Sequence, residues 1–275
     1  MKLVTLVEDS QRDLSLGSEH GVSFYTETNE HKLLFDVGQT DLYALNASKL
    51  GIDINDVDTV VISHGHYDHG GGLEHFLSIN DHATIYIQKT AFAELYSMRN
   101  PNEYTYIGLN QKLDRSRFSL FEGDLRIDEE LMLFSRVENK DLFPTSNQTL
   151  YQKKGDQLIA DNFDHEQNLL VNTNSGHVLF AGCAHKGIVN IINQAERFIN
   201  GNKINAVFGG FHLISRYEEF EESKENIEKI AYLLQTKQID KYYTGHCTGS
   251  IALTIMNGIL QERLQRFYPG LQVEV

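Results

Sequence analysis

The sequence predicts an α/β protein whose elements form a four-layer αββα sandwich. Each half of the chain opens with short apolar stretches that are typical of β-strands, and each half then alternates between strands and helices. Two β-rich halves of this kind are expected to pack face to face with their helices outside. We therefore expect residues 1–275 to form a single domain rather than two independent ones.

Apolar runs bounded by turn-forming residues define the expected elements. In the first half, strands are expected at 2–8, 21–27, 31–38, 58–64 and 83–88, and helices at 41–50 and 73–79. In the second half, strands are expected at 168–173, 176–182, 204–210 and 241–246, and helices at 188–198, 218–235 and 249–266. Residues 98–148 are less regular, and we expect an insertion of loops and short strands there. It is either a plain connection or a lid over a substrate.

Composition narrows the classes of function. The net charge of −14 repels phosphate backbones and anionic membrane surfaces, so neither nucleic acid nor a membrane is expected as a partner. Two cysteines are too few for a disulfide framework, and no signal peptide or membrane span is recognised, so we expect a cytoplasmic protein. The expected partner is a small-molecule substrate, and the sequence does not specify the oligomeric state.

Four metal-ligand side chains lie together in the stretch VVISHGHYDHGGGL. His64, His66, Asp68 and His69 fall within six residues, directly after an apolar strand. Imidazole and carboxylate groups are suitable ligands for zinc, manganese or iron. Two such ions a few ångströms apart polarise a substrate and generate hydroxide near neutral pH. The stretch therefore predicts a dinuclear metal site, most simply with two zinc ions.

The segment HGHYDH resembles the His-x-His-x-Asp-His signature of the metallo-β-lactamase superfamily, which has the αββα fold. The resemblance implies that His64 and His66 bind one metal, and that Asp68 and His69 bind the other. It also implies that Asp36, at an earlier strand end, supports the ligands through hydrogen bonds.

Further ligands are expected at later strand ends, where three histidines each follow an apolar strand and a glycine. These are His185 in LFAGCAH, His212 in VFGGFH and His246 in YYTGHCTG. His246 matches the last histidine of the superfamily. We expect His185 to complete the shell of the first metal, and His212 to act either as a ligand or as an acid–base group facing the substrate.

The chain also departs from the common superfamily pattern. The usual histidine of a G-H-x-x-G turn is absent, and Cys183 stands where an aspartate would bridge the metals. Cys183 either ligates, bridges or packs as a small buried residue. His165, near the displaced position, is expected to have an accessory role.

The combination of GCAH, GGFH and GHCTG resembles a narrower, pterin-linked branch named after a dihydropterin-ribofuranosylaminobenzene phosphate synthase. The leading hypothesis is a hydrolase-like enzyme in which a hydroxide held by two metals, with Asp68 and His212 as catalytic residues, attacks a small anionic or phosphorylated substrate. A transferase of the pterin-linked type is the close alternative. A third hypothesis is a metal-binding ligand sensor with little turnover. Lys186, Arg99, Tyr104 and Tyr106 are candidate substrate contacts.

Overall fold

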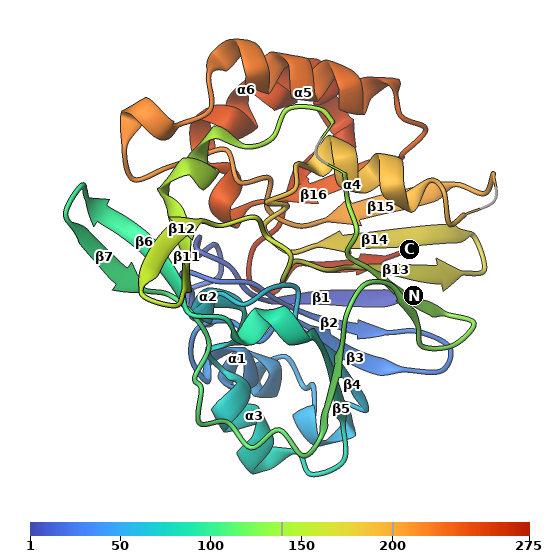
Figure 1. Ribbon diagram of the computed structural model, residues 1–275. Coiled ribbons are helices and arrows are strands. Elements are labelled where there is room, and N and C mark those ends of the chain that lie inside the picture. Colours follow the sequence, from blue (N-terminus) through green and yellow to red (C-terminus); the bar gives the residue numbers. More distant parts are fainter. Residues whose placement is uncertain (139, 200) are drawn as a thin grey trace.

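The computed structural model describes residues 1–138, 140–199 and 201–275. Two seven-stranded sheets pack face to face, and a four-stranded sheet lies beside them. Helices α1 (Leu42–Lys49) and α3 (Leu73–Ile79) cover the outer face of the first sheet, whereas α4 (Ile188–Ala195), α5 (Lys224–Thr236) and α6 (Ser250–Leu260) cover the second (Figure 1). The predicted αββα architecture is confirmed.

The first sheet has the order β18-β1-β2-β3-β4-β5-β8. Its strands are β1 (Lys2–Val7), β2 (Ser23–Glu27), β3 (Lys32–Phe35), β4 (Thr59–Val61), β5 (Thr84–Gln88), β8 (Phe118–Phe121) and β18 (Gln272–Glu274). Strands β3, β4, β5 and β8 run parallel to one another. Their carboxyl ends therefore share one edge of the sheet, where a site can be built from several strands.

The second sheet repeats this plan in the order β17-β16-β15-β14-β13-β10-β9. Its strands are β9 (Leu125–Arg126), β10 (Leu131–Phe134), β13 (Asn168–Thr173), β14 (Gly176–Ala181), β15 (Ile204–Phe208), β16 (Lys241–Thr244) and β17 (Leu264–Arg266). Strands β14 to β17 are parallel, so the second sheet also has one edge of carboxyl ends.

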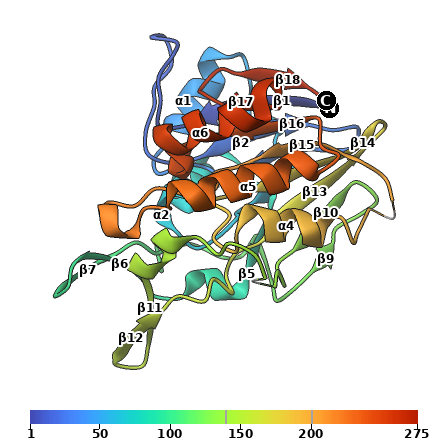
Figure 2. The ribbon, with the colours of Figure 1, turned by 90° about the horizontal axis from the view of Figure 1, so that it is seen from above.

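Two hairpins form the third sheet, which projects from the body of the molecule in both views (Figures 1 and 2). Its strands are β6 (Leu95–Asn100), β7 (Glu103–Tyr106), β11 (Leu150–Lys154) and β12 (Gln157–Ala160). The remaining elements are single turns: α2 (Tyr67–Gly70), η1 (Ile54–Asp56), η2 (Lys89–Phe92), η3 (Thr145–Thr149), η4 (Glu218–Phe220), η5 (His246–Thr248) and η6 (Gln261–Arg263).

Aromatic side chains fill the space between the two large sheets. Phe180 of β14 is fully buried, and its ring centroid lies 5.2 Å from that of Phe35 and 5.5 Å from that of Phe208. Alternation along each strand directs one set of side chains inward and the other set toward the helices. This central layer holds the two sheets, and hence their strand ends, in a fixed relation.

Helix α5 shows how local sequence fixes an element. Its buried residues Ile227, Ile230, Ala231 and Leu234 recur at helical spacing and face the second sheet. The Ser223 side chain accepts a hydrogen bond from the backbone N–H of Asn226 and caps the first turn. This cap explains why the helix begins at Lys224 rather than at residue 218 as predicted.

One further prediction was wrong. The last helix was expected to reach residue 266, but it ends at Leu260, because Gln261 adopts a φ of 52° that a right-handed helix excludes. The chain then forms β17. Segment 98–148 contains loops and short strands, and two of these strands, β8 (Phe118–Phe121) and β10 (Leu131–Phe134), extend the two large sheets. Leu131 and Leu133 of β10 are fully buried in the layer between the sheets, which draws this segment into the core.

Candidate metal centre

The predicted ligand residues follow strands whose carboxyl ends meet where the two sheets adjoin. His64, His66, Asp68 and His69 follow β4, Cys183 and His185 follow β14, His212 follows β15, and His246 follows β16. One large sheet thus supplies half of the residues and the other sheet supplies the rest. The structure brings all eight residues into two overlapping clusters and the cavity beside them.

Three imidazoles form what we term the first donor group: His64, His66 and His185. Their ring centroids lie 4.6 Å (His64 to His66), 4.9 Å (His64 to His185) and 5.0 Å (His66 to His185) apart. The Nε2 atom of each ring is buried and has no hydrogen-bond partner among the described residues. Buried polar atoms without partners are costly, and three adjacent ones fit the ligand set of a divalent transition metal.

The protonation of these rings suits ligation. Burial, followed by the charge of nearby His165, lowers the pKa of His66 to about 3. Burial and the neighbouring imidazoles also lower the pKa values of His64 and His185 well below the ordinary histidine value. Neutral imidazoles keep a lone pair for a metal, so this group would not have to lose protons before it held an ion.

Hydrogen bonds fix which nitrogen of each ring is free. The Ser63 hydroxyl donates to Asp36 Oδ2 (2.7 Å) and accepts from His64 Nδ1 (2.8 Å). Asn147 Oδ1 accepts from His185 Nδ1 (3.0 Å). With Nδ1 protonated in both rings, Nε2 carries the lone pair. Sequence reasoning missed Ser63 and Asn147, since neither is a ligand type.

The second donor group consists of Asp68, His69, Cys183 and His246, all buried, with donor atoms within 4.8 Å of one another. His246 Nε2 lies 3.2 Å from Asp68 Oδ2, and His69 Nε2 lies 3.1 Å from Cys183 Sγ. Burial raises the pKa of Asp68, but the charges of His69 and His246 lower it by more, so this carboxyl is ionised. Carboxylate, imidazole and sulfur together form a set that suits zinc.

Asp36 lies behind both donor groups and is fully buried. Its Oδ2 is 2.6 Å from His69 Nδ1, and its Oδ1 accepts the backbone N–H of Ser63 at 2.7 Å. Asp36 thus orients His69 directly and His64 through Ser63, the supporting position that the superfamily resemblance implies.

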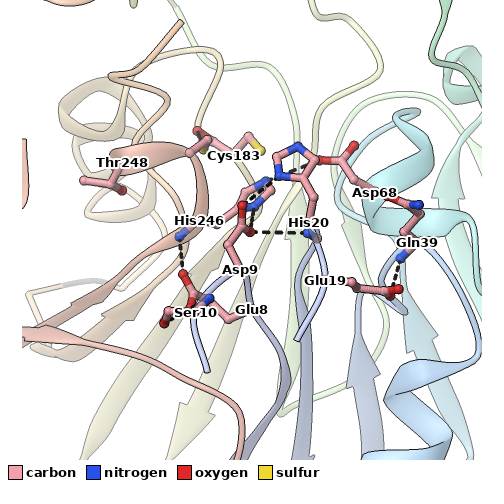
Figure 3. Close-up of polar contacts among 12 residues, drawn as sticks. Glu8, Asp9, Ser10, Glu19, His20, Gln39, Asp68, Cys183, His246 and Thr248 are labelled. Carbon is pink, nitrogen blue, oxygen red and sulfur yellow. Dashed lines mark hydrogen bonds and ion pairs between the residues drawn. The ribbon is translucent and has the colours of Figure 1, made fainter. Parts of the chain in front are cut away.

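An acidic pair at the end of β1 supports His246 and was missed from the sequence. Glu8 Oε1 accepts the backbone N–H of His246 (2.8 Å), and Asp9 Oδ1 lies 2.6 Å from His246 Nδ1 (Figure 3). Asp9 Oδ2 also contacts His20 Nδ1 at 2.8 Å, and His20 points toward Asp68 (Figure 3). Because Glu8 and Asp9 stand at the end of an expected strand, the sequence could have identified them as candidate site residues. His20 has no ligand spacing in the sequence and was not among the predicted site residues.

The Cys183 sulfur lies close to members of both donor groups. It clusters with Asp68, His69 and His246, and also with His64 and His185. Burial, followed by the neighbouring Cys247, raises the pKa of the Cys183 thiol. Among the alternatives weighed for Cys183, its place between the groups favours a ligating or bridging role over simple packing.

Glycines at the strand ends allow the backbone to approach these side chains closely. A Cβ on Gly182 would lie 2.2 Å from Ser63 Oγ, and one on Gly209 would lie 1.7 Å from the carbonyl oxygen of Ala181. Neither position has room for a side chain. The backbone is strained at the site as well, because Asp36, His212 and His246 adopt φ values of 60°, 52° and 47°.

A cavity of about 410 Å³ opens beside the donor groups. His20, His66, Asp68, Cys183, His185, His212 and His246 contribute to its wall. His212 is half-buried, its ring centroid lies 4.2 Å from that of His185, and neither of its nitrogens has a partner among the described residues. His212 is therefore placed both to contact a substrate and to approach the metal donors.

Other candidates have different positions. His165 accepts the Gly65 N–H at Nδ1 (3.2 Å) and contacts Asp161 at Nε2 (3.0 Å), so both its nitrogens are engaged behind His66. Lys186 donates to the carbonyl oxygen of Asn162 (2.6 Å) and does not line the cavity. Arg99 does line it, whereas Tyr104 and Tyr106 do not.

Comparison with known proteins gives consistent results. The profile of the metallo-beta-lactamase superfamily matches residues 17–136. The solved structure of Tm1679, described as a metal-dependent hydrolase of the beta-lactamase superfamily, is 30% identical, with a TM-score of 0.84, and the match covers 100% of this chain and 99% of that chain. Zinc-bound PqqB from Methylobacterium extorquens shares the fold at 11% identity, with a TM-score of 0.57 and complete coverage of both chains.

The chain belongs to the metallo-β-lactamase superfamily, as its fold and its 30% identity to Tm1679 over the whole chain show. Within that superfamily it is similar to 7,8-dihydropterin-6-methyl-4-(β-D-ribofuranosyl)-aminobenzene-5'-phosphate synthase of Methanocaldococcus jannaschii. The two are 28% identical over 98% of this chain and 95% of the relative. The resemblance to the pterin-linked branch, inferred from GCAH, GGFH and GHCTG, is therefore confirmed. No helix within the described residues combines the length and apolar character needed to span a membrane.

Proposed function

We propose that this protein is a metal-dependent hydrolase acting on a small anionic molecule. The observation that carries this proposal is the set of three buried Nε2 atoms of His64, His66 and His185, which have no hydrogen-bond partner among the described residues and lie next to a second buried donor group. The first donor group would hold one divalent ion. The second would hold another, with Cys183 shared between them.

Bound ions would supply Lewis-acid polarisation of the substrate and a nucleophile near neutral pH. The protein's own residues prepare the cavity for this chemistry. Asp36 and Ser63 hold His64 and His69, Asn147 holds His185, and the Glu8 and Asp9 pair holds His246. Within the part of the chain that the structure describes, neither ring nitrogen of His212 has a hydrogen-bond partner, so either can exchange a proton with a substrate in the cavity.

Zinc is the proposed metal, because imidazole, carboxylate and sulfur donors occur together. Manganese prefers oxygen donors, and only Asp68 supplies one in the two donor groups. A small molecule is the proposed substrate, since the net charge of −14 opposes binding of nucleic acid.

A transferase is the second candidate, and one finding favours it. The Methanocaldococcus jannaschii relative, similar over nearly the whole chain, is named a synthase. The same ligand arrangement would serve either reaction, since only the acceptor differs: water for a hydrolase and a second substrate for a transferase. The sensor hypothesis is less supported, because the donor groups lie directly beside a cavity large enough for a small substrate.

Metal content and water incorporation test the proposal together. Protein expressed with added zinc is expected to contain about two equivalents by elemental analysis. His64→Ala should lose most of this metal, whereas the exposed control His82→Ala should retain it. Less than half an equivalent in folded wild-type protein would contradict the proposal.

The acceptor is identified by turnover of a panel of small esters, lactones and phosphoesters in ¹⁸O-labelled water. A hydrolase places one labelled oxygen in the product. Zinc-loaded protein that turns over none of these molecules, but joins two substrates without incorporating label, would favour the transferase.

A further inference from the structure

We propose that Arg99 and Arg216 form an anion-binding subsite in the cavity wall, and that this subsite holds a phosphate group carried by the substrate. The inference rests on the proposed function, since it assigns a substrate class to the same cavity. The phosphate would contribute to substrate binding, and its subsite is separate from the donor groups.

The first observation concerns charge. The chain carries 38 acidic against 24 basic side chains, yet the described residues lining this cavity include two arginines and only one carboxylate, Asp68. That carboxylate is already engaged by His246 at 3.2 Å. The cavity is therefore locally cationic in an acidic protein, an arrangement that attracts an anion.

The second observation is that both guanidinium groups are available. Within the described part of the chain, neither Arg99 nor Arg216 lies within 4.0 Å of a carboxylate oxygen, and neither side chain donates a hydrogen bond. A guanidinium group offers several N–H donors in a planar fork that matches phosphate oxygens. Two guanidinium groups at one cavity suit a phosphate dianion better than they suit the single negative charge of a carboxylate.

Third, the two arginines come from separate segments of the chain, and a hydrogen bond connects these segments. Arg99 lies in β6 where the pairing with β7 shifts register between Met98 and Asn100, an irregularity that redirects side chains. Arg216 lies in the connection between β15 and α5. The Tyr217 hydroxyl donates a hydrogen bond to the Arg99 carbonyl oxygen, which ties this connection to the hairpin.

Fourth, the same cavity reaches both the arginines and the predicted ligands. Arg99, Arg216, His66 and Asp68 all line its wall, so one ligand that fills the cavity would contact both regions. The cavity volume of about 410 Å³ accommodates a metabolite-sized phosphate ester that spans both regions.

Phenyl phosphate binding to the metal-free protein tests the subsite without relying on the metals. Titration calorimetry at low ionic strength is expected to show binding that weakens with added salt. Arg99→Gln and Arg216→Gln should each weaken it by about tenfold, the loss typical of a charge-assisted hydrogen-bonded contact. Arg197→Gln, an exposed control, should leave it unchanged. Benzoate should bind more weakly than phenyl phosphate, and benzyl alcohol should not bind.

Absence of binding to the wild-type protein, or equal binding by the wild type and both cavity variants, would overturn the proposal. Benzoate binding as tightly as phenyl phosphate would overturn the assignment of a phosphate group. Arg99→Lys and Arg216→Lys keep the charge and should retain part of the affinity, which separates loss of the anion contact from misfolding. Because the protein is metal-free, failure here leaves the metal-dependent function standing, and failure of the metal test leaves the subsite standing.

Discussion

Replacing Asp36 with asparagine isolates the support behind both donor groups. The Asp36 carboxylate accepts three hydrogen bonds: from the Ser63 N–H at 2.7 Å, the Ser63 hydroxyl at 2.7 Å and His69 Nδ1 at 2.6 Å. An amide keeps one acceptor oxygen and turns an NH₂ group toward the remaining donors. His69 must then either lose a partner or move its proton to Nε2, the nitrogen that faces Cys183.

The expected size of the effect follows from these contacts. Loss of two hydrogen bonds to a buried charged group lowers the free energy of unfolding by about 3 kcal/mol. Loss of a carboxylate that orients a ligating histidine lowers metal affinity by about 10- to 100-fold. We therefore expect Asp36→Asn to be folded, less stable and a weaker zinc binder than the wild-type protein.

Two measurements check this prediction. Urea unfolding of the metal-free protein gives the stability change, and competition with a chromophoric chelator gives the zinc affinity. Asp114→Asn, an exposed acidic position away from the site, is the matched control and should change neither quantity. Wild-type zinc affinity in Asp36→Asn would refute the argument that hydrogen bonds from Asp36 set the ligand geometry.

Three other predictions concern the shared sulfur, the core and a charged contact. Cys183→Ser should lower the metal content, whereas Cys247→Ser should largely retain it; equal loss would contradict a special role for Cys183. Phe180→Ala should lower the free energy of unfolding by about 3 to 5 kcal/mol, because it empties the layer between the sheets, and a loss as small as that of exposed Tyr232→Ala would contradict this. Burial lowers the pKa of His31, but two carboxylate contacts raise it by more. The free energy of unfolding lost in His31→Gln should thus be largest below about pH 6.5 and vanish as the pH rises above the folded-state pKa. If urea unfolding shows a difference between wild type and variant that widens as the pH rises, the prediction is contradicted.

The sequence predicted most of the elements that lead into the site. The expected strand 58–64 and helix 73–79 correspond to β4 and α3, because apolar periodicity and glycine turns are local signals. The ligand prediction for His64 to His69 also rested on a local signal, because the candidate ligands lie close together in the sequence. A ligand-rich motif directly after a strand needs no knowledge of distant contacts.

Tertiary contacts account for what the sequence did not predict. Asp9 meets His246 across 237 residues, and Asn147 meets His185 across 38 residues, so neither pair has a spacing to recognise. The positive φ of Gln261, which ends α6 early, occurs at a residue type with no preference for it. Strand β10 lies in an irregular stretch, and only its pairing with β13 makes its role evident.

The division of the donors between two sheets makes a bound ion a cross-link. His69 Nε2 and Cys183 Sγ lie 3.1 Å apart but are separated by 114 residues along the chain. An ion held by both would close a loop of that length, as a disulfide does, and would remove conformational freedom from the unfolded chain. In the chain-entropy description, a loop of this size corresponds to about 4 to 5 kcal/mol. The metal would thus fasten the two halves of the sandwich to each other.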